Sequence, residues 1–264
     1  MYLNIKNIIM THHFKKAIIR KPCKNVIYGI SSKKIQPSYN KLVEEHEYYT
    51  KTLRNLNLEI IRLNELENFP DSVFVEDPAI IYKSICIILN PRDKSRNYES
   101  KIIKNEIKNY FDNILFIENG FVEGGDVLNI NDHFIIGTSS RTNKVGAQNL
   151  ANLLVSLGAS VKICETPNTI LHFKSECSYL ETDTILVSKQ MSQLEYLKSN
   201  YNLIELPIGE EGAANSLRIN DKLLIPDGFN EADAMLSKNF DIIKIKVDEI
   251  FKLDAGLSCM SLRW

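Results

Sequence analysis

The fold is indicated most clearly by one stretch, Phe121–Gly137, which reads FVEGGDVLNINDHFIIG. It begins with an acidic cluster and continues as two β-like apolar runs that are separated by Asn131 and Asp132. Both of these residues tolerate the left-handed backbone conformation that tight turns require. The stretch therefore predicts a β-hairpin whose first strand starts beside carboxylates.

Four other segments repeat this arrangement of a polar cluster beside β-like runs. Their starts lie roughly 35 to 55 residues apart, and repeated units of this length indicate a ring or an array. They read FVEDPAIIYKSICIIL (Phe74–Leu89), CSYLETDTILVS (Cys177–Ser188), AANSLRINDKLLIP (Ala213–Pro226) and GLSCMSLRW (Gly256–Trp264). In a ring, equivalent strand ends converge on one axis. Six polar residues would then gather there: Glu76, Asp77, Glu123, Asp126, Asn215 and Cys259.

Helix-like sequence fills most of the gaps between the repeats. We predict helices from apolar spacing and stop signals over Pro37–Leu56, Asn97–Phe111, Thr142–Leu157, Ser192–Ser199 and Asn230–Asn239. Strands are expected at His13–Arg20 and Leu58–Leu63, with a loop at Lys21–Ser32.

The chain shows no internal boundary, because no Pro/Gly/Ser-rich linker or abrupt change of composition divides it. A single domain over residues 1–264 is therefore expected. Alternating strands and helices could also form a doubly wound parallel sheet, but its GxGxxG fingerprint is absent. The hairpins favour antiparallel units, and so we expect an α/β ring.

The composition is that of an ordinary soluble protein, with 264 residues, 44% hydrophobic and 25% charged, and a net charge of −1. This charge gives no field that would attract nucleic acid or an anionic membrane. No apolar run approaches the roughly 18–20 residues that span a bilayer, and Met1–Met10 lacks the features of a signal peptide. The five cysteines share no CxxC spacing, so we expect reduced thiols in the cytoplasm.

Cys259 is the first candidate for chemistry. It follows Gly256, where the backbone can approach another group closely, and it lies between two serines. A free cysteine is more often a small buried hydrophobic residue. That interpretation suffices for the other four: Cys23, Cys86, Cys164 and Cys177.

A nucleophilic cysteine needs a positioned acid or base, and His172 is the best partner. It ends a strand-like segment and has apolar neighbours. A lone histidine in such a place is more often a satisfied core residue. Solvated positions suffice for the remaining histidines: His12, His13, His46 and His133.

Paired carboxylates, Glu76 with Asp77 and then Glu123, stand beside strands that we expect to be buried. Buried carboxylates are costly unless they are paired or hydrogen-bonded. Arginines or backbone amides could satisfy them, and so could a cationic ligand. Gly124 and Gly125 favour the ligand, because glycines admit close approach. A metal is the third alternative, but HxH and HExxH spacings are absent, so no metal is predicted.

The combination of a thiol with several acids narrows the chemistry. Acids close to a thiol raise its pKa and suppress the thiolate, which does not suit a protease. A cationic substrate would offset the acids and favour the thiolate. A guanidinium group is planar and presents a fork of N–H donors that carboxylates match. The residues therefore predict attack on a guanidinium carbon.

At these residues the chain resembles the dimethylarginine dimethylaminohydrolases, which belong to the guanidino-group-modifying (pentein) superfamily. The likeness covers roughly Phe14–Trp264, and separated motifs agree in order and spacing. The matching segments are Pro70–Asp77, Glu123–Leu128, Ser140–Asn143, Leu171–Ser175, Ala213–Asn215 and Gly256–Cys259.

The resemblance implies a five-bladed α/β propeller with its active site on the axis. It implies hydrolysis of asymmetric dimethylarginine or monomethylarginine to citrulline and a methylated amine. Cys259 would be the nucleophile and form a covalent thiouronium intermediate. His172 would protonate the leaving amine and then activate water, and Glu123 would orient His172.

The resemblance also implies how the substrate, a small guanidino amino acid, is held. Asp77, with Glu76 beside it, would bind the guanidinium. The other implied roles are Asp71 near the α-amino group, Arg96 and Arg141 on the α-carboxylate, Ile30 in a mobile lid over Val26–Ser32, and a backbone contact at Leu253. No cofactor or catalytic metal is implied, and a homodimer is expected from bacterial relatives.

Two alternatives remain open at this point. An arginine deiminase would act on unmethylated arginine with the same machinery, although typical deiminases carry an inserted helical region. A non-catalytic propeller that binds another macromolecule would not need Cys259, His172 and Glu123 together.

Overall fold

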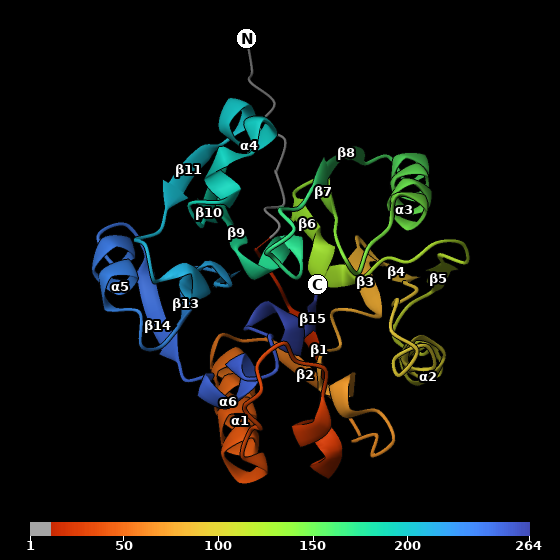
Figure 1. The fold of residues 1–264 in the computed structure, drawn as a ribbon. Helices are drawn as coiled ribbons and strands as arrows, with labels where there is room; N and C mark the ends of the chain where they lie inside the picture. The colour runs from red at the N-terminus through yellow and green to blue at the C-terminus, as the bar shows by residue number, and fades with distance from the viewer. Residues whose placement is uncertain (1–11) are drawn as a thin grey trace.

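The computed structural model describes residues 12–264, which form five small sheets around one axis (Figure 1). In this described part, each sheet is a blade of three strands. The blades are β15 (Leu262–Arg263), β1 (Lys16–Arg20) and β2 (Glu59–Leu63); β3 (Ala79–Tyr82), β4 (Ile85–Ile88) and β5 (Asn113–Phe116); β6 (Val127–Ile130), β7 (His133–Thr138) and β8 (Ser160–Glu165); β9 (Cys177–Glu181), β10 (Thr184–Val187) and β11 (Asn202–Glu205); β12 (Leu217–Ile219), β13 (Lys222–Pro226) and β14 (Asp241–Ile245). The predicted α/β propeller is confirmed, and the doubly wound sheet is excluded. The interpretation of Met1–Met10 concerns residues outside the described range.

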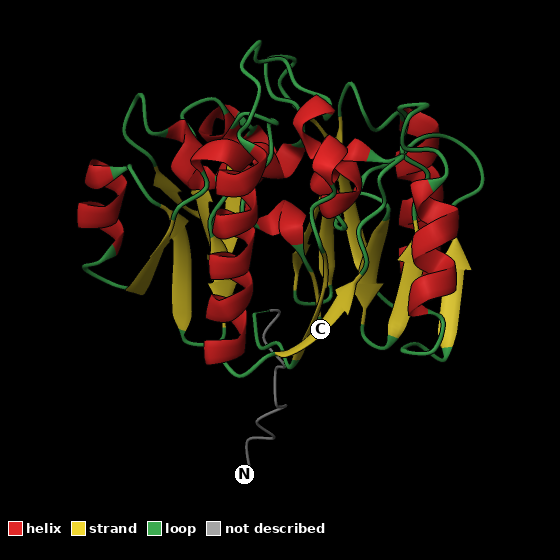
Figure 2. Ribbon diagram, turned by 90° about the horizontal axis from the view of Figure 1, so that it is seen from below, coloured by secondary structure: helices red, strands yellow, loops and turns green. Residues whose placement is uncertain are grey.

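Every blade has the same internal topology, in which an antiparallel strand pair is followed by a helix and a parallel outer strand. Parallel strands need a long crossover, which explains why each helix falls between the second and third strands. The crossover helices are α1 (Tyr39–Asn55), α2 (Glu99–Ile107), α3 (Lys144–Ser156), α4 (Glu195–Asn200) and α5 (Asn230–Leu236). Figure 2 shows these helices beside the strands of their blades. Within residues 12–264, no helix is both long and apolar enough to cross a membrane.

The helix predicted over Ser192–Ser199 is wrong at its start. Leu194 has an extended backbone, so a short 3-10 helix, Met191–Gln193, precedes α4 and is separate from it. The loop predicted over Lys21–Ser32 contains a 3-10 helix as well, Lys24–Tyr28. Both differences concern single turns, which leave little periodic signal in a sequence.

Four hairpins turn at a residue with a left-handed backbone. The φ angles are 57° at Lys83, 58° at Asn131, 50° at Thr182 and 54° at Asn220. Asparagine visits this region readily, so the turns at Asn131 and Asn220 were predictable. The turns at Lys83 and Thr182 adopt the same conformation without a favourable residue, because the blade topology requires it there.

The central strand of each blade contributes many of the buried apolar residues. Cys86, Ile87 and Ile88 on β4 are all buried, and so are Leu223, Leu224 and Ile225 on β13. Each central strand is covered on both faces by neighbouring blades, which explains its continuous apolar sequence. The outer strands β5 and β14 consist mostly of exposed and half-buried residues instead.

Two of the histidines assigned to solvated positions are buried, so that assignment is wrong for them. His46 lies on α1 four residues after Leu42 and three before Tyr49, on the face that packs into the core. Burial, together with the charge of the nearby Arg62, lowers the pKa of His46 to about 3. His12 is also buried, and burial lowers its pKa to about 4, together with the charges of His13 and Arg218.

We expect Leu262→Ala to lower the free energy of unfolding by about 2–5 kcal/mol, because a large buried side chain would leave a cavity. Leu262 pairs with Ile18 in the strand contact that closes the ring. Urea denaturation measures the change, and the one tryptophan, Trp264, reports it from its contact with Phe111. Val155→Ala, at an exposed position of α3, should stay within about 0.5 kcal/mol. Equal losses in both variants would show that ring closure adds no stability.

Candidate active site

The five blades place polar residues at the same end of their innermost strands. Asp77 precedes β3, Glu123 precedes β6, His172 precedes β9, Asn215 precedes β12 and Cys259 precedes β15. A short 3-10 helix lies at or near each of these positions: Pro70–Val73, Gly124–Asp126, Phe173–Ser175, Glu211–Ala214 and Ser258–Met260. These residues therefore lie around the axis, as the repeats predicted for all of them except His172.

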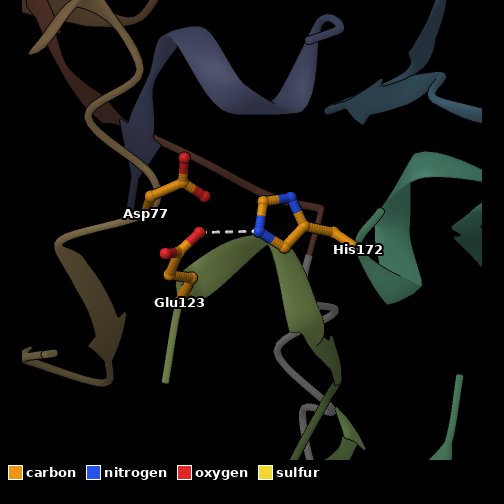
Figure 3. Close-up of side chains that lie close together, drawn as sticks. All are labelled: Asp77, Glu123 and His172. Carbon is orange, nitrogen blue, oxygen red and sulfur yellow. Dashed lines mark hydrogen bonds and ion pairs between the residues drawn. The ribbon is translucent and has the colours of Figure 1, made fainter. Parts of the chain in front are cut away.

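His172 and Glu123 form a buried pair, with 2.8 Å between Nε2 and Oε2 (Figure 3). Burial would lower the pKa of His172, but the carboxylates of Asp126, Glu123 and Asp77 outweigh it and raise the pKa to about 9. Burial likewise opposes ionisation of Glu123, yet the hydrogen bond with His172 holds its pKa below the ordinary value. At neutral pH the pair is an imidazolium with a carboxylate.

Gly125 makes room for the imidazole. A Cβ atom on this residue would lie 2.7 Å from Cγ of His172, which is closer than side chains pack. The close approach that the two glycines after Glu123 predicted is therefore used by the protein itself, to seat the histidine.

The second oxygen of Glu123 faces two arginines. Oε1 accepts a hydrogen bond from the backbone N–H of Arg92 at 3.1 Å and lies 3.7 Å from Nη1 of Arg141. Arg141 is thus placed at the site, as predicted. Arg92 was not predicted, because it acts here through its backbone, which carries no residue-specific signal.

Asp77 is held by Arg96 rather than left open. Oδ2 of Asp77 accepts from Nη1 of Arg96 at 2.5 Å, and Oδ1 accepts from the backbone N–H of Gly125 at 3.3 Å. Arg96 is buried and also donates to Oε2 of Glu99 and to two backbone carbonyls. Its role on the α-carboxylate stays a prediction, since these contacts are all to the protein.

Glu99 is a member of this network that the sequence analysis missed. Burial raises its pKa to about 7, although the charge of Arg96 opposes that shift. The available signal was the spacing of three residues between Glu99, at the start of α2, and Arg96 in the turn before it. It predicts only that the two side chains can meet, not that both are buried.

Asp77, Glu123 and His172 have ligand atoms within 4.8 Å of one another, a spacing that one metal ion could bridge. Figure 3 shows the three side chains pointing toward a common space. Each already has a protein hydrogen bond. Two carboxylates beside an imidazolium suit a cation that brings N–H donors, so a guanidinium fits the arrangement. The expectation of no catalytic metal stays a prediction.

The thiol of Cys259 is partly exposed, and its Sγ accepts from the backbone N–H of Gly256 at 3.5 Å. Burial, together with the charges of Glu76 and Asp77, raises the pKa of Cys259 to about 12. The free site therefore holds a neutral thiol at pH 7. This agrees with the effect expected from acids beside a thiol.

Glu76 is buried, and side chains of the protein occupy both of its carboxylate oxygens. Oε1 accepts from Nζ of Lys174 at 2.6 Å and from Nη2 of Arg263 at 3.2 Å, and Oε2 accepts from Oγ of Ser258 at 2.9 Å. These four residues line a cavity of about 140 Å³. A substrate contact by Glu76 stays a prediction.

The remaining predicted residues lie together in the lid region. The backbone N–H of Ile30 donates to Oδ1 of Asp71 at 2.9 Å, and Leu253 is buried beside Gly29. Burial raises the pKa of Asp71, although the charge of Arg96 opposes that shift. A separate cavity of about 460 Å³ is lined by Ser32, at the end of the lid segment, by Asn215 and by Gly256, whose backbone N–H donates to Sγ of Cys259.

A five-bladed ring of ββαβ units, with a cysteine, a histidine and acids on its axis, defines the pentein class of guanidino-group-modifying enzymes. A protein-family comparison agrees, since residues 64–207 match the model of the arginine deiminase family. The chain belongs to the dimethylarginine dimethylaminohydrolase family, as the following relatives show.

The chain is 34% identical to the N(G),N(G)-dimethylarginine dimethylaminohydrolase of Pseudomonas aeruginosa, over 95% of this chain and 100% of that protein. It is 25% identical to the Streptomyces coelicolor enzyme of the same name, over 94% of this chain and 96% of that protein. A cysteine-to-serine variant of the P. aeruginosa enzyme, solved with citrulline, superposes with a TM-score of 0.92, at 33% identity, over 96% of this chain and 100% of that chain. The N-terminal domain of ArgZ, a cyanobacterial arginine dihydrolase, has a TM-score of 0.82 at 14% identity, over 94% of this chain and 96% of that chain, and shares the fold.

The high thiol pKa predicts how Cys259 reacts with iodoacetamide in the free protein. Only the thiolate is nucleophilic, so the rate should rise about tenfold per pH unit from about pH 7 to about pH 9.5, without a plateau. Mass spectrometry of the alkylated peptide measures the rate. Cys259→Ser reports the background from the other four cysteines. A plateau near pH 8 would contradict the assigned environment.

Proposed function

We propose that this chain hydrolyses Nω-methylated arginine to citrulline and a methylated amine. The observation that carries the proposal is the His172–Glu123 pair, faced by Asp77, at the axis where Cys259 also lies. An acid cluster of this kind selects a cation. The names of the relatives agree with this chemistry.

Binding of the substrate prepares the nucleophile. The guanidinium lies against the carboxylates of Asp77 and Glu123, and its positive charge offsets the acids that raise the pKa of Cys259. The thiol then releases its proton to solvent. The thiolate forms only when the electrophilic carbon is beside it.

The first chemical step makes one bond and breaks another. Sγ of Cys259 attacks the guanidinium carbon, and the bond from that carbon to the methylated nitrogen breaks. His172 donates its proton to the departing amine. A pKa of about 9 keeps this histidine protonated at neutral pH until it is needed. The product of the step is a thiouronium on Cys259 and a neutral imidazole.

The second step restores the enzyme. The neutral imidazole of His172 takes a proton from water, and the hydroxide attacks the carbon of the thiouronium. The carbon–sulfur bond breaks, and the hydroxyl proton of the tetrahedral adduct passes to the departing sulfur, which releases citrulline and the neutral thiol of Cys259. Glu123 stabilises the imidazolium that forms again, through the 2.8 Å contact.

The amino-acid end of the substrate is held at the entrance. Asp71 accepts the α-ammonium, and Arg141, with Arg96, holds the α-carboxylate. Ile30 and Leu253 close over the chain of methylene groups. The contact between Ile30 and Asp71 supports this, because it links the lid directly to the proposed ammonium site.

The proposal includes the organisation of the protein. One catalytic domain spans residues 1–264, because the strand at its C-terminal end completes the first blade. The enzyme acts in the cytoplasm as a homodimer and uses no cofactor.

The first test is citrulline release from asymmetric dimethylarginine, monomethylarginine and arginine, measured side by side with purified protein. We expect turnover of the methylated substrates to exceed that of arginine. Cys259→Ser should lose all turnover, since no other group can form the thiouronium. Preference for arginine would make the chain a deiminase, and equal activity of the serine variant would remove Cys259 as nucleophile.

Arg141→Ala should raise KM for amino-acid substrates by roughly 10- to 100-fold, the loss expected for a charged hydrogen bond. For guanidines that lack the α-carboxylate, KM should change little. Steady-state kinetics with both substrate types measures the difference. Arg54→Ala, at an exposed position on α1, is the matched control. Equal losses for both substrate types would show that Arg141 does not hold the α-carboxylate.

A further inference from the structure

Asp126 is a buried carboxylate that none of the steps above uses. It lies three residues after Glu123 and is fully shielded from solvent. Its two oxygens accept hydrogen bonds from different segments: Oδ1 from the backbone N–H of Phe173 at 2.8 Å, and Oδ2 from Oγ of Ser139 at 2.7 Å. One side chain therefore joins two parts of the site that are distant in sequence.

The first of these bonds acts on the general acid. Phe173 follows His172 directly, so its N–H belongs to the peptide that carries the histidine. The N–H of His172 itself donates to Oγ of Ser175 at 3.3 Å. Together these bonds fix the backbone on both sides of His172. The orientation of the imidazole toward Glu123 depends on that backbone.

The second bond acts on the segment that carries Arg141. Oγ of Ser139 donates to Asp126 and accepts from the backbone N–H groups of Arg141 at 3.0 Å and Thr142 at 3.1 Å. The hydroxyl of Ser139 thus connects Asp126 by hydrogen bonds to the turn at residues 139–142. Oγ1 of Thr142 in turn accepts from the N–H of Glu123 at 3.1 Å.

Asp126 also places a charge behind the imidazole. Burial without partners would be costly for a carboxylate, but here both oxygens accept from N–H or O–H donors. Burial raises the pKa of Asp126, and the charge of His172 with the hydrogen bonds from Thr142, Ser139 and Phe173 opposes that shift. His172 is therefore flanked by three carboxylates: Glu123, Asp77 and Asp126.

We propose that Asp126 is a positioning residue that couples the general acid, His172, to Arg141, which holds the α-carboxylate of the substrate. Through Phe173 it holds His172 against Glu123, and through Ser139 it holds the turn that carries Arg141. The two ends of the substrate are then aligned by one buried side chain. This inference rests on the proposed function, and the experiment below separates the two.

Asp126→Asn is the direct test, because asparagine has the same shape but only one accepting oxygen. It can satisfy Phe173 or Ser139 but not both. We expect kcat to fall at least about tenfold and KM to rise several-fold. The pKa of the His172 imidazole, followed by NMR of ¹⁵N-labelled histidine, should fall, since Glu123 and Asp77 remain but one negative charge is lost.

Ser139→Ala removes only one of the two hydrogen bonds of Asp126, and it is informative even if Asp126→Asn does not fold. It removes the link to Arg141 and keeps the bond from Phe173 to Asp126. We expect KM to rise several-fold, with kcat and the imidazole pKa close to wild type. An unchanged KM would overturn the coupling to Arg141.

Glu106→Gln is the matched control. Its carboxylate is bound by both terminal nitrogens of Arg20, so the change also removes a paired charge, but on α2 away from the axis. It should leave kcat, KM and the imidazole pKa unchanged. A folded Asp126→Asn protein that behaves like this control would overturn the proposal. If the wild type turned over no methylated arginine, the proposed function would fail, while the imidazole titration would still test Asp126.

Discussion

The antiparallel pairing of β15 with β1 is the constraint on which the site depends. It joins the two ends of the described chain and completes the first blade, with Leu262 opposite Ile18. Cys259 lies three residues before Leu262, so the pairing that closes the ring also delivers the nucleophile to the axis. The backbone carbonyl of Cys259 accepts from the N–H of Glu76 at 3.3 Å. Ring closure and the placement of the thiol are thus one event.

The sequence predicted the ring because every repeat contains its own polar cluster and most contain a turn. Cys259, Glu123 and Asp77 were found because they occupy the same position in different repeats. His172 was found as a histidine with apolar neighbours at the end of a strand-like segment. Partners between repeats could not be predicted, and Lys174 with Arg263 on Glu76 is the main example. Which side chains meet across blades depends on the packing of the whole ring, and local spacing does not encode it.

The same limit explains the two histidines that were placed wrongly. A helical pattern gives the face of His46, but whether that face is covered depends on the neighbouring blade. Likewise, the close approach predicted at the glycines after Glu123 was interpreted as room for a cationic ligand. In the structure the approach is to the ring of His172. Sequence patterns therefore identified where contacts are tight, and only the packed ring identified the partners.

The acids at the axis couple reactivity to recognition. Because burial and the charges of Glu76 and Asp77 raise the pKa of Cys259, only a small fraction of this residue is thiolate at pH 7 in the free protein. A neutral molecule in the cavity does not change that fraction, whereas a guanidinium offsets Glu76 and Asp77. Arginine and its methylated forms carry the same charge, so all of them offset Glu76 and Asp77 equally. Discrimination among them must come from the shape of the walls, where one methyl group contributes about 1–3 kcal/mol.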